Sequence, residues 1–116
     1  MGDTYMQNGY CVPPEPTDIK EKALKESSRW GFIDRKSVIK LYTMSAQALP
    51  KYLWNYWKYK LKEDNLSWQV FLRIFSACDN AVVEWVDSKI TWEELVKTVI
   101  KIIEKAKKGS YPLWPP

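Results

Sequence analysis

The segment 68–87 constrains the fold most, because its helical period leaves it almost no polar side. Placed at 100° per residue, its apolar positions cover about two-thirds of the helix circumference. The centre of that arc holds Trp68, Phe71, Ile74, Phe75, Cys78, Val82 and Trp85. A helix with so narrow a polar stripe needs neighbours on several sides. We therefore expect a helical bundle with this segment in the middle.

The other apolar residues between the chain's two tails also recur with helical spacing, and no run alternates as a strand would. We expect five helices, over residues 18–30, 35–48, 50–62, 68–87 and 91–108. Thr17, Asp34 and the Thr91–Glu94 capping box are predicted to start the first, second and fifth helices, and Pro50 to open the third. The inward side of the second helix is predicted as Val38, Leu41, Tyr42, Ser45 and Leu49. The fold class is all-α, a compact five-helix bundle.

Prolines mark both tails. Pro13, Pro14 and Pro16 exclude a helix near the start, and three more prolines follow Gly109. We therefore predict a Pro-rich leader over residues 1–16, a single helical domain over residues 17–108, and a Pro/Trp-containing C-terminal tail over residues 109–116.

The composition excludes several kinds of chemistry. The chain has no histidine, which removes the commonest general base and metal ligand. Its four glycines lie in the tails or at a helix end, so no glycine-rich loop can cradle a phosphate. Asp79 is the one charge within the apolar arc, and we expect it at the edge of the arc beside a lysine. We predict no enzyme, no metal and no cofactor.

The two cysteines fit neither a CxxC redox pair nor a metal site, since Cys11 and Cys78 are far apart in the sequence. We expect two reduced thiols inside a cell. The alternative is a Cys11–Cys78 disulfide, which intracellular proteins of hyperthermophiles can contain.

Charge alternates along the chain although the net charge is only +4. Residues 35–62 contain seven basic residues and no acidic one, whereas residues 63–94 contain seven acidic residues and two basic ones. The basic block is the part that can attract phosphate or another anionic surface.

The third helix carries the candidate site. Leu53, Trp54, Trp57 and Leu61 form its predicted core side, and a lysine row runs beside a tyrosine row on the opposite side. The lysine row is Lys51, Asn55, Lys58 and Lys62, the tyrosine row is Tyr52, Tyr56 and Tyr59, and Arg35, Lys36 and Lys40 of the preceding helix add charge. Lysines neutralise phosphates and aromatic rings stack on unpaired bases, so the rows predict nucleic-acid binding with little sequence preference.

Two other roles fit the same helix. An adaptor, inhibitor or assembly protein would use the tyrosines on a protein partner, and a cationic helix rich in tryptophan and tyrosine also suits a membrane surface. The wide apolar side of the 91–108 helix is covered either within the chain or by a homodimer. No segment is apolar enough for a membrane span, and a cytoplasmic location (that of a host cell for a viral protein) is the expectation. In general character the chain is similar to accessory proteins of archaea and their viruses, but no motif carries a residue's role across.

Overall fold

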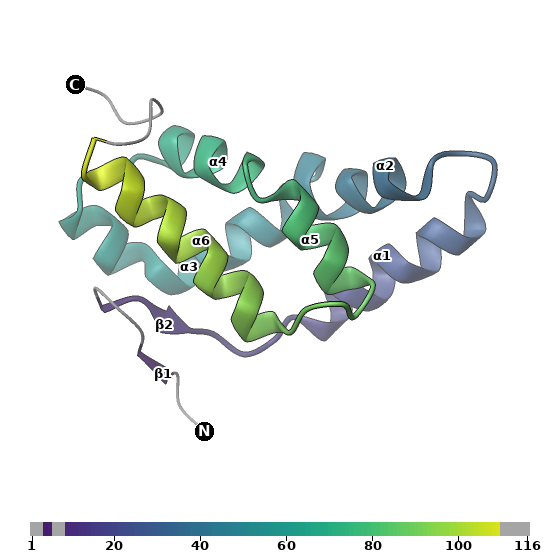
Figure 1. Ribbon diagram of the computed structural model, residues 1–116, viewed down its shortest axis with the longest axis horizontal. Helices are drawn as coiled ribbons and strands as arrows, with labels where there is room; N and C mark the ends of the chain where they lie inside the picture. Colours follow the sequence, from purple (N-terminus) through teal and green to yellow (C-terminus); the bar gives the residue numbers. More distant parts are fainter. Residues whose placement is uncertain (1–3, 6–8, 110–116) are drawn as a thin grey trace.

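The computed structural model describes residues 4–5 and 9–109, and this part of the chain is mostly helical (Figure 1). The elements are β1 (Thr4–Tyr5), β2 (Cys11–Val12), α1 (Thr17–Arg29), α2 (Arg35–Lys40), the π-helix η2 (Leu41–Ser45), α3 (Ala48–Glu63), α4 (Trp68–Ser76), α5 (Asp79–Val86) and α6 (Trp92–Lys107). The two short strands pair antiparallel. The predicted all-α bundle is confirmed, with α2 continuing into η2 and with α4 and α5 sharing the segment predicted as the fourth helix.

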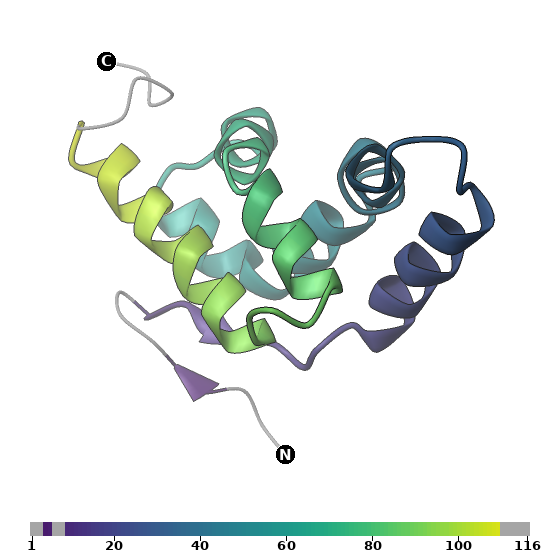
Figure 2. The ribbon, with the colours of Figure 1, turned by 45° about the vertical axis from the view of Figure 1, so that its right-hand side comes forward.

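The helices form two groups that meet at α5 and where η2 packs against α3. α1, α2 and η2 pack together at one end of the molecule, while α3, α4 and α6 surround the other end. α5 contacts α1 and α2 on one side and α6 on the other, as the turned view shows (Figure 2). The described part is flattened, with extents of 43 × 35 × 21 Å.

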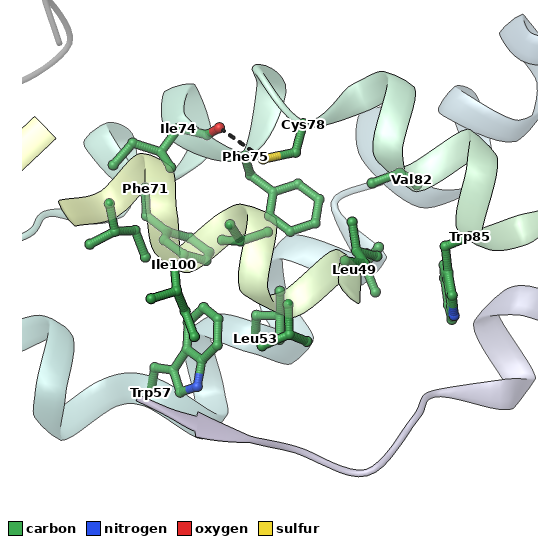
Figure 3. Packing of buried hydrophobic residues seen from close by; sticks show 14 of the residues in the cluster. Leu49, Leu53, Trp57, Phe71, Ile74, Phe75, Cys78, Val82, Trp85 and Ile100 are labelled. Carbon is green, nitrogen blue, oxygen red and sulfur yellow. Dashed lines mark hydrogen bonds between the residues drawn. The ribbon is translucent and has the colours of Figure 1, made fainter. Parts of the chain in front are cut away.

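The core follows the predicted arc of the 68–87 segment. Phe71, Ile74 and Phe75 of α4 are fully buried against Leu49 and Leu53 of α3 (Figure 3). Three further members of the predicted arc are buried as well, namely Cys78, Val82 and Trp85. Trp68 is half-buried. Burial of this arc on several sides confirms that the segment lies in the middle of the bundle.

The fourth predicted helix is interrupted at residues 77–78, which the sequence pattern did not show. The Ser76 hydroxyl donates to the Leu72 carbonyl at 2.8 Å, and the Cys78 backbone N–H reaches only as far back as the Phe75 carbonyl, at 2.9 Å. Hydrogen bonds from a serine to the carbonyl one turn earlier bend helices, and an i→i−3 bond tightens the last turn. Asp79 then begins α5, so the chain turns while its apolar side stays inward.

The π-helix η2 also changes a prediction. Its wider turn closes through the Ala46 N–H, which donates to the Leu41 carbonyl at 3.0 Å. The inward side predicted for the second helix is therefore partly wrong: Val38 is buried, but Leu41 is 53% exposed and Thr43 lies inward, with its hydroxyl bonded to the Ile39 carbonyl.

Two of the predicted helix starts are confirmed and two are wrong. The Asp34 side chain accepts the Ser37 N–H, and Thr91 forms a complete capping box with Glu94. Thr17 is instead the first helical residue after Pro16. α3 begins at Ala48, two residues before Pro50, because Gln47 adopts the left-handed conformation with φ 60°. Proline costs little there, since the first four N–H groups of a helix have no partner within it.

Residues 9–16, which we call the strap, lie along the bundle beneath α3 and α6 (Figure 1). Tyr10 is fully buried, and Cys11, Pro13 and Pro16 are buried as well. The sequence pattern marked these residues as part of a leader and gave no sign of this packing.

Aromatic side chains of the helices hold the strap by hydrogen bonds. Trp57 Nε1 donates to the Cys11 carbonyl at 2.6 Å, and Trp92 Nε1 donates to the Pro13 carbonyl at 2.7 Å. The Tyr52 hydroxyl donates to the Pro14 carbonyl, and Trp85 Nε1 donates to the Glu15 carboxylate at 2.8 Å. In Figure 3 the indole nitrogens of Trp57 and Trp85 both point toward the strap. α3, α5 and α6 are thereby tied to one extended segment.

The start of the strap is anchored by a buried carboxylate. The Tyr10 hydroxyl donates to Asp64 Oδ2 at 2.6 Å, and Lys107 Nζ approaches the same oxygen at 2.9 Å. Burial alone raises the pKa of Asp64, but the hydrogen bonds from Tyr10 and Lys107, with the charges of Lys107 and Lys60, outweigh burial and hold that pKa below its ordinary value. Burial, together with the nearby negative charge, raises the pKa of Tyr10.

We predict that Tyr10→Phe lowers the free energy of unfolding by about 1.5–3 kcal/mol, because it removes a hydrogen bond to a charged group and keeps the ring. Urea unfolding followed by tryptophan fluorescence measures this. Tyr59→Phe is the matched control, since Tyr59 is 91% exposed and its change should stay within about 0.5 kcal/mol. Equal effects of the two variants would contradict the anchoring role of Tyr10.

We also predict that Lys107→Gln changes the acid dependence of stability. The depressed pKa of Asp64 stabilises the fold above the pKa of the unfolded chain, about 4, and this stabilisation is lost as the pH falls through the lower folded pKa. The difference in free energy of unfolding between wild type and Lys107→Gln should therefore be largest near pH 7 and should decrease below about pH 4. Lys101→Gln on the exposed side of α6 is the control, and a difference independent of pH would contradict the prediction.

Candidate functional site

The core side of α3 is oriented as predicted. Leu53, Trp57 and Leu61 are buried, and Trp54 is half-buried. Lys60 and Lys62 stand in the last turn of α3, where their positive charges offset the negative end of the helix dipole. The opposite side of α3 consequently faces solvent.

The lysine row of α3 is exposed along its whole length. Lys51, Asn55, Lys58 and Lys62 all lie on the solvent side. Within the part of the chain that the structure describes, no carboxylate pairs with Lys51, Lys58 or Lys62. Their charges therefore remain available to an external anion.

Lys60 behaves differently from the row. Its ammonium lies 2.9 Å from Glu63 and 3.6 Å from Asp64, and its hydrogen bond to Glu63 raises the pKa of Lys60 most. Lys60 therefore neutralises charge within the fold.

The tyrosine row is divided by the strap. Tyr59 is 91% exposed and Tyr56 is 42% exposed. Tyr52 is half-buried, its ring centroid lies 5.0 Å from that of Tyr56 and 6.3 Å from that of Trp92, and its hydroxyl is bonded to the strap. Tyr59 and Tyr56 thus present ring surface to solvent, whereas Tyr52 mainly supports the fold.

The basic residues of α2 do not join this surface. Arg35 pairs with Asp87 and donates to Ser27, and Lys40 pairs with Asp79 at 3.1 Å. Asp79 therefore lies beside a lysine, as predicted. Lys36 is exposed, but α2 lies at the opposite end of the long axis from the last turns of α3 (Figure 1).

A groove beside the lysine row was not predicted. It lies between the end of α3 and the start of α4, has a volume of about 440 Å³, and is lined by Trp54, Lys58, Tyr59, Lys62, Leu66, Ser67 and Trp68. The Trp54 and Trp68 rings meet edge to face with centroids 5.4 Å apart. The only sequence signal was the short turn after Glu63, which returns Trp68 to the side of α3.

We define the α3 surface as Lys51, Asn55, Tyr56, Lys58, Tyr59 and Lys62 together with this groove. It combines ammonium groups that have no carboxylate partner among the described residues with aromatic rings that are exposed or half-buried. Such a surface can bind an anionic ligand that also carries flat apolar rings.

The described residues hold no group of three or more Cys, Asp or Glu side chains arranged for a metal ion. No disulfide joins Cys11 and Cys78, and both side chains are buried. Burial, with a smaller contribution from the charge of Asp79, raises the pKa of Cys78 to about 12, so its reactive thiolate form is scarce at neutral pH.

The apolar side of α6 is covered within the chain. Its buried residues are Trp92, Leu95, Val96, Val99, Ile100, Ile103 and Ala106. Ile102 is half-buried, so in the described structure the apolar side of α6 gives no support to the alternative of a homodimer through this helix. Among the described helices, none has the length and apolarity to span a membrane.

We predict that Lys60 is the slowest of the four α3 lysines to react with an amine-acylating reagent at pH 8. Its raised pKa lowers its share of neutral amine, and its ion pairs hold the ammonium group, whereas Lys51, Lys58 and Lys62 are exposed. Mass spectrometry of peptides after brief acylation measures the order. Faster reaction at Lys60 than at Lys58 would contradict the orientation of α3.

Comparison of the chain with protein-family models, curated proteins and solved structures finds no match in any of the three. A function for the chain therefore rests on the geometry of its own surfaces.

Proposed function

We propose that this protein is a non-catalytic binding module that holds single-stranded nucleic acid on the α3 surface with little sequence preference. The observation that carries the proposal is the row of three exposed lysines without carboxylate partners among the described residues, beside an almost fully exposed tyrosine and an aromatic groove.

The lysines supply the phosphate contacts. Lys58 and Lys62 both line the groove, one helical turn apart, which is about 6 Å along the axis. Lys51 extends the same row toward the start of α3. Each lysine that neutralises a phosphate releases counterions, and this release drives binding without reading sequence.

The aromatic rings supply contacts for bases. Tyr59 projects a ring into solvent, and Trp54 and Trp68 form walls of the groove. A groove of about 440 Å³ falls within the usual range for sites that take small planar groups. Only unpaired bases expose their faces for stacking, which favours a single strand over a duplex.

The surface offers little for reading base edges. Asn55 is the one amide on it, and α3 contains no arginine that could form a bidentate contact with guanine. We therefore expect weak discrimination among base sequences.

A protein partner at the same surface is the competing interpretation. Tyrosine and tryptophan are enriched at protein interfaces, but lysine is depleted in their cores. Such a partner would need to be acidic to match three unpaired ammonium groups. This makes the salt dependence of oligonucleotide binding the deciding measurement.

We predict that the logarithm of the affinity for a fluorescent single-stranded oligonucleotide falls with the logarithm of salt concentration at a slope of about −2. The slope for single strands is about −0.7 per phosphate contact, and three lysines are available. Fluorescence anisotropy between 20 and 200 mM salt measures it. No binding at the lowest salt, or a flat dependence, would contradict the proposal.

Variants assign the site. Lys58→Gln/Lys62→Gln should reduce the slope to about −0.7, because one contact remains. The matched control is Lys101→Gln/Lys105→Gln on the exposed side of α6, which removes the same charge elsewhere. Equal effects of the two double variants would show a response to net charge instead of a site.

Stacking has its own test. Tyr59→Ala should weaken binding by about 5-fold to 150-fold, the loss expected for one stacked base of about 1–3 kcal/mol. Tyr59→Phe keeps the ring and should bind like wild type. If Tyr59→Ala bound with the affinity of the wild type, no base would stack on Tyr59.

A further inference from the structure

Exposed apolar side chains gather at the end of the molecule opposite the α3 surface. Phe32 is 80% exposed, Leu41 is 53% exposed and Ile33 is 42% exposed, and apart from Tyr56 and Tyr59 they are the exposed large apolar side chains of the described chain. Ile33 and Leu41 line a groove of about 470 Å³ between the α1–α2 turn and η2, and Phe32 packs on Trp30, which forms one of its walls.

The walls of this groove are held in place by one carboxylate. Glu26 Oε1 accepts a hydrogen bond from Trp30 Nε1 at 2.8 Å and another from the Tyr42 hydroxyl at 3.2 Å. Trp30 and Tyr42 both line the groove, so Glu26 fixes two aromatic walls relative to each other. The groove is therefore a preformed feature.

The π-helix helps to create the exposed apolar surface. A regular helix would turn Leu41 inward beside Val38, but in η2 Thr43 is buried and Leu41 faces out. π-helical turns are rare and frequently occur at functional sites. Here the irregular turn places a leucine at the edge of an apolar groove.

The rim of the groove is basic. Lys40 lines it and pairs with Asp79, and Arg29 lies 6.0 Å from the Trp30 ring and pairs with Glu26 at 3.8 Å. Lys36 is exposed one turn before Lys40, and Lys22 stands over the Tyr42 ring at 5.5 Å. Among the described residues, neither Lys22 nor Lys36 has a carboxylate partner. An occupant that complements this rim carries negative charge.

A second copy of the chain is a poor source of that charge. The acidic block 63–94 uses most of its carboxylates internally: Glu63 and Asp64 pair with Lys60, Asp79 with Lys40, and Asp87 with Arg35. A flat membrane surface suits a protruding ridge better than a concave groove. We propose that this groove docks an amphipathic helix of another protein, one that carries acidic residues beside its apolar side.

The test uses a fluorescein-labelled synthetic 16-residue helical peptide with leucines along one side and glutamates flanking them, and a second peptide with lysines in place of the glutamates. The full-length protein should bind the glutamate peptide at least tenfold more tightly than the lysine peptide. Leu41→Ser should weaken binding of the glutamate peptide at least tenfold, and Lys36→Glu should narrow the preference between the two peptides. Tyr59→Ser is the matched control and should leave binding unchanged.

Other outcomes would overturn the proposal. Circular dichroism first confirms that Leu41→Ser, a change at an exposed position, keeps the helical signal. Absence of peptide binding, or equal binding of both peptides, would show that the groove does not bind an acidic helix. Dimerisation in sedimentation experiments that Leu41→Ser abolishes would assign the groove to a second copy. Binding to phosphatidylserine vesicles that is lost in Leu41→Ser, without peptide binding, would assign it to a membrane surface.

Discussion

The structure depends on how the proline-rich strap satisfies its backbone. Proline has no N–H, so Pro13, Pro14 and Pro16 do not fit a helix interior, and the carbonyl groups of buried strap residues such as Cys11 still need donors. A buried indole has the complementary problem, because its N–H needs an acceptor. Trp57 and Trp92 satisfy both the indole N–H groups and the buried carbonyls by donating to the Cys11 and Pro13 carbonyls. The bonds satisfy these buried groups and hold α3 and α6 on the same segment.

This arrangement also determines which side of α3 is available. Trp57 faces inward to reach the strap, and Tyr52 reaches it from the edge of the same helix. With those two residues engaged, the positions on the other side of the helix can only face solvent. The exposure of Lys51, Lys58 and Tyr59 is thus a consequence of core contacts made elsewhere on α3. The same geometry explains why the tyrosine row is not a uniform surface.

Most of the fold could be predicted because it is encoded locally. The 3.6-residue period of the apolar side chains gave the helices and the core side of α3, and side-chain caps such as Asp34 and Thr91 marked two helix starts. The structure departs from the prediction where its shape depends on specific side-chain contacts, which the period of the apolar residues does not report. The break before Asp79 and the widened turn at Leu41 depend on side-chain bonds to carbonyls and on packing between helices. The groove between Trp54 and Trp68 needs two segments to be placed in space, and the strap needs partners up to 79 residues away.

Charge pairing within the fold explains where the basic surface appears. The chain alternates between acidic and basic blocks, and the structure joins them. Asp79 of α5 holds Lys40 of α2, Asp87 directly after α5 holds Arg35 of α2, and Asp64 holds Lys107 of α6. These pairs engage three of the seven acidic residues of the acidic block, and they link segments that are far apart in the sequence. On α3, Lys60 pairs with Glu63 and Asp64, whereas Lys51, Lys58 and Lys62 have no carboxylate partner among the described residues. The internal ion pairs determine which basic side chains remain available, so the position of the α3 surface follows from the packing of the helices. A net charge of only +4 is therefore compatible with a locally strong positive field.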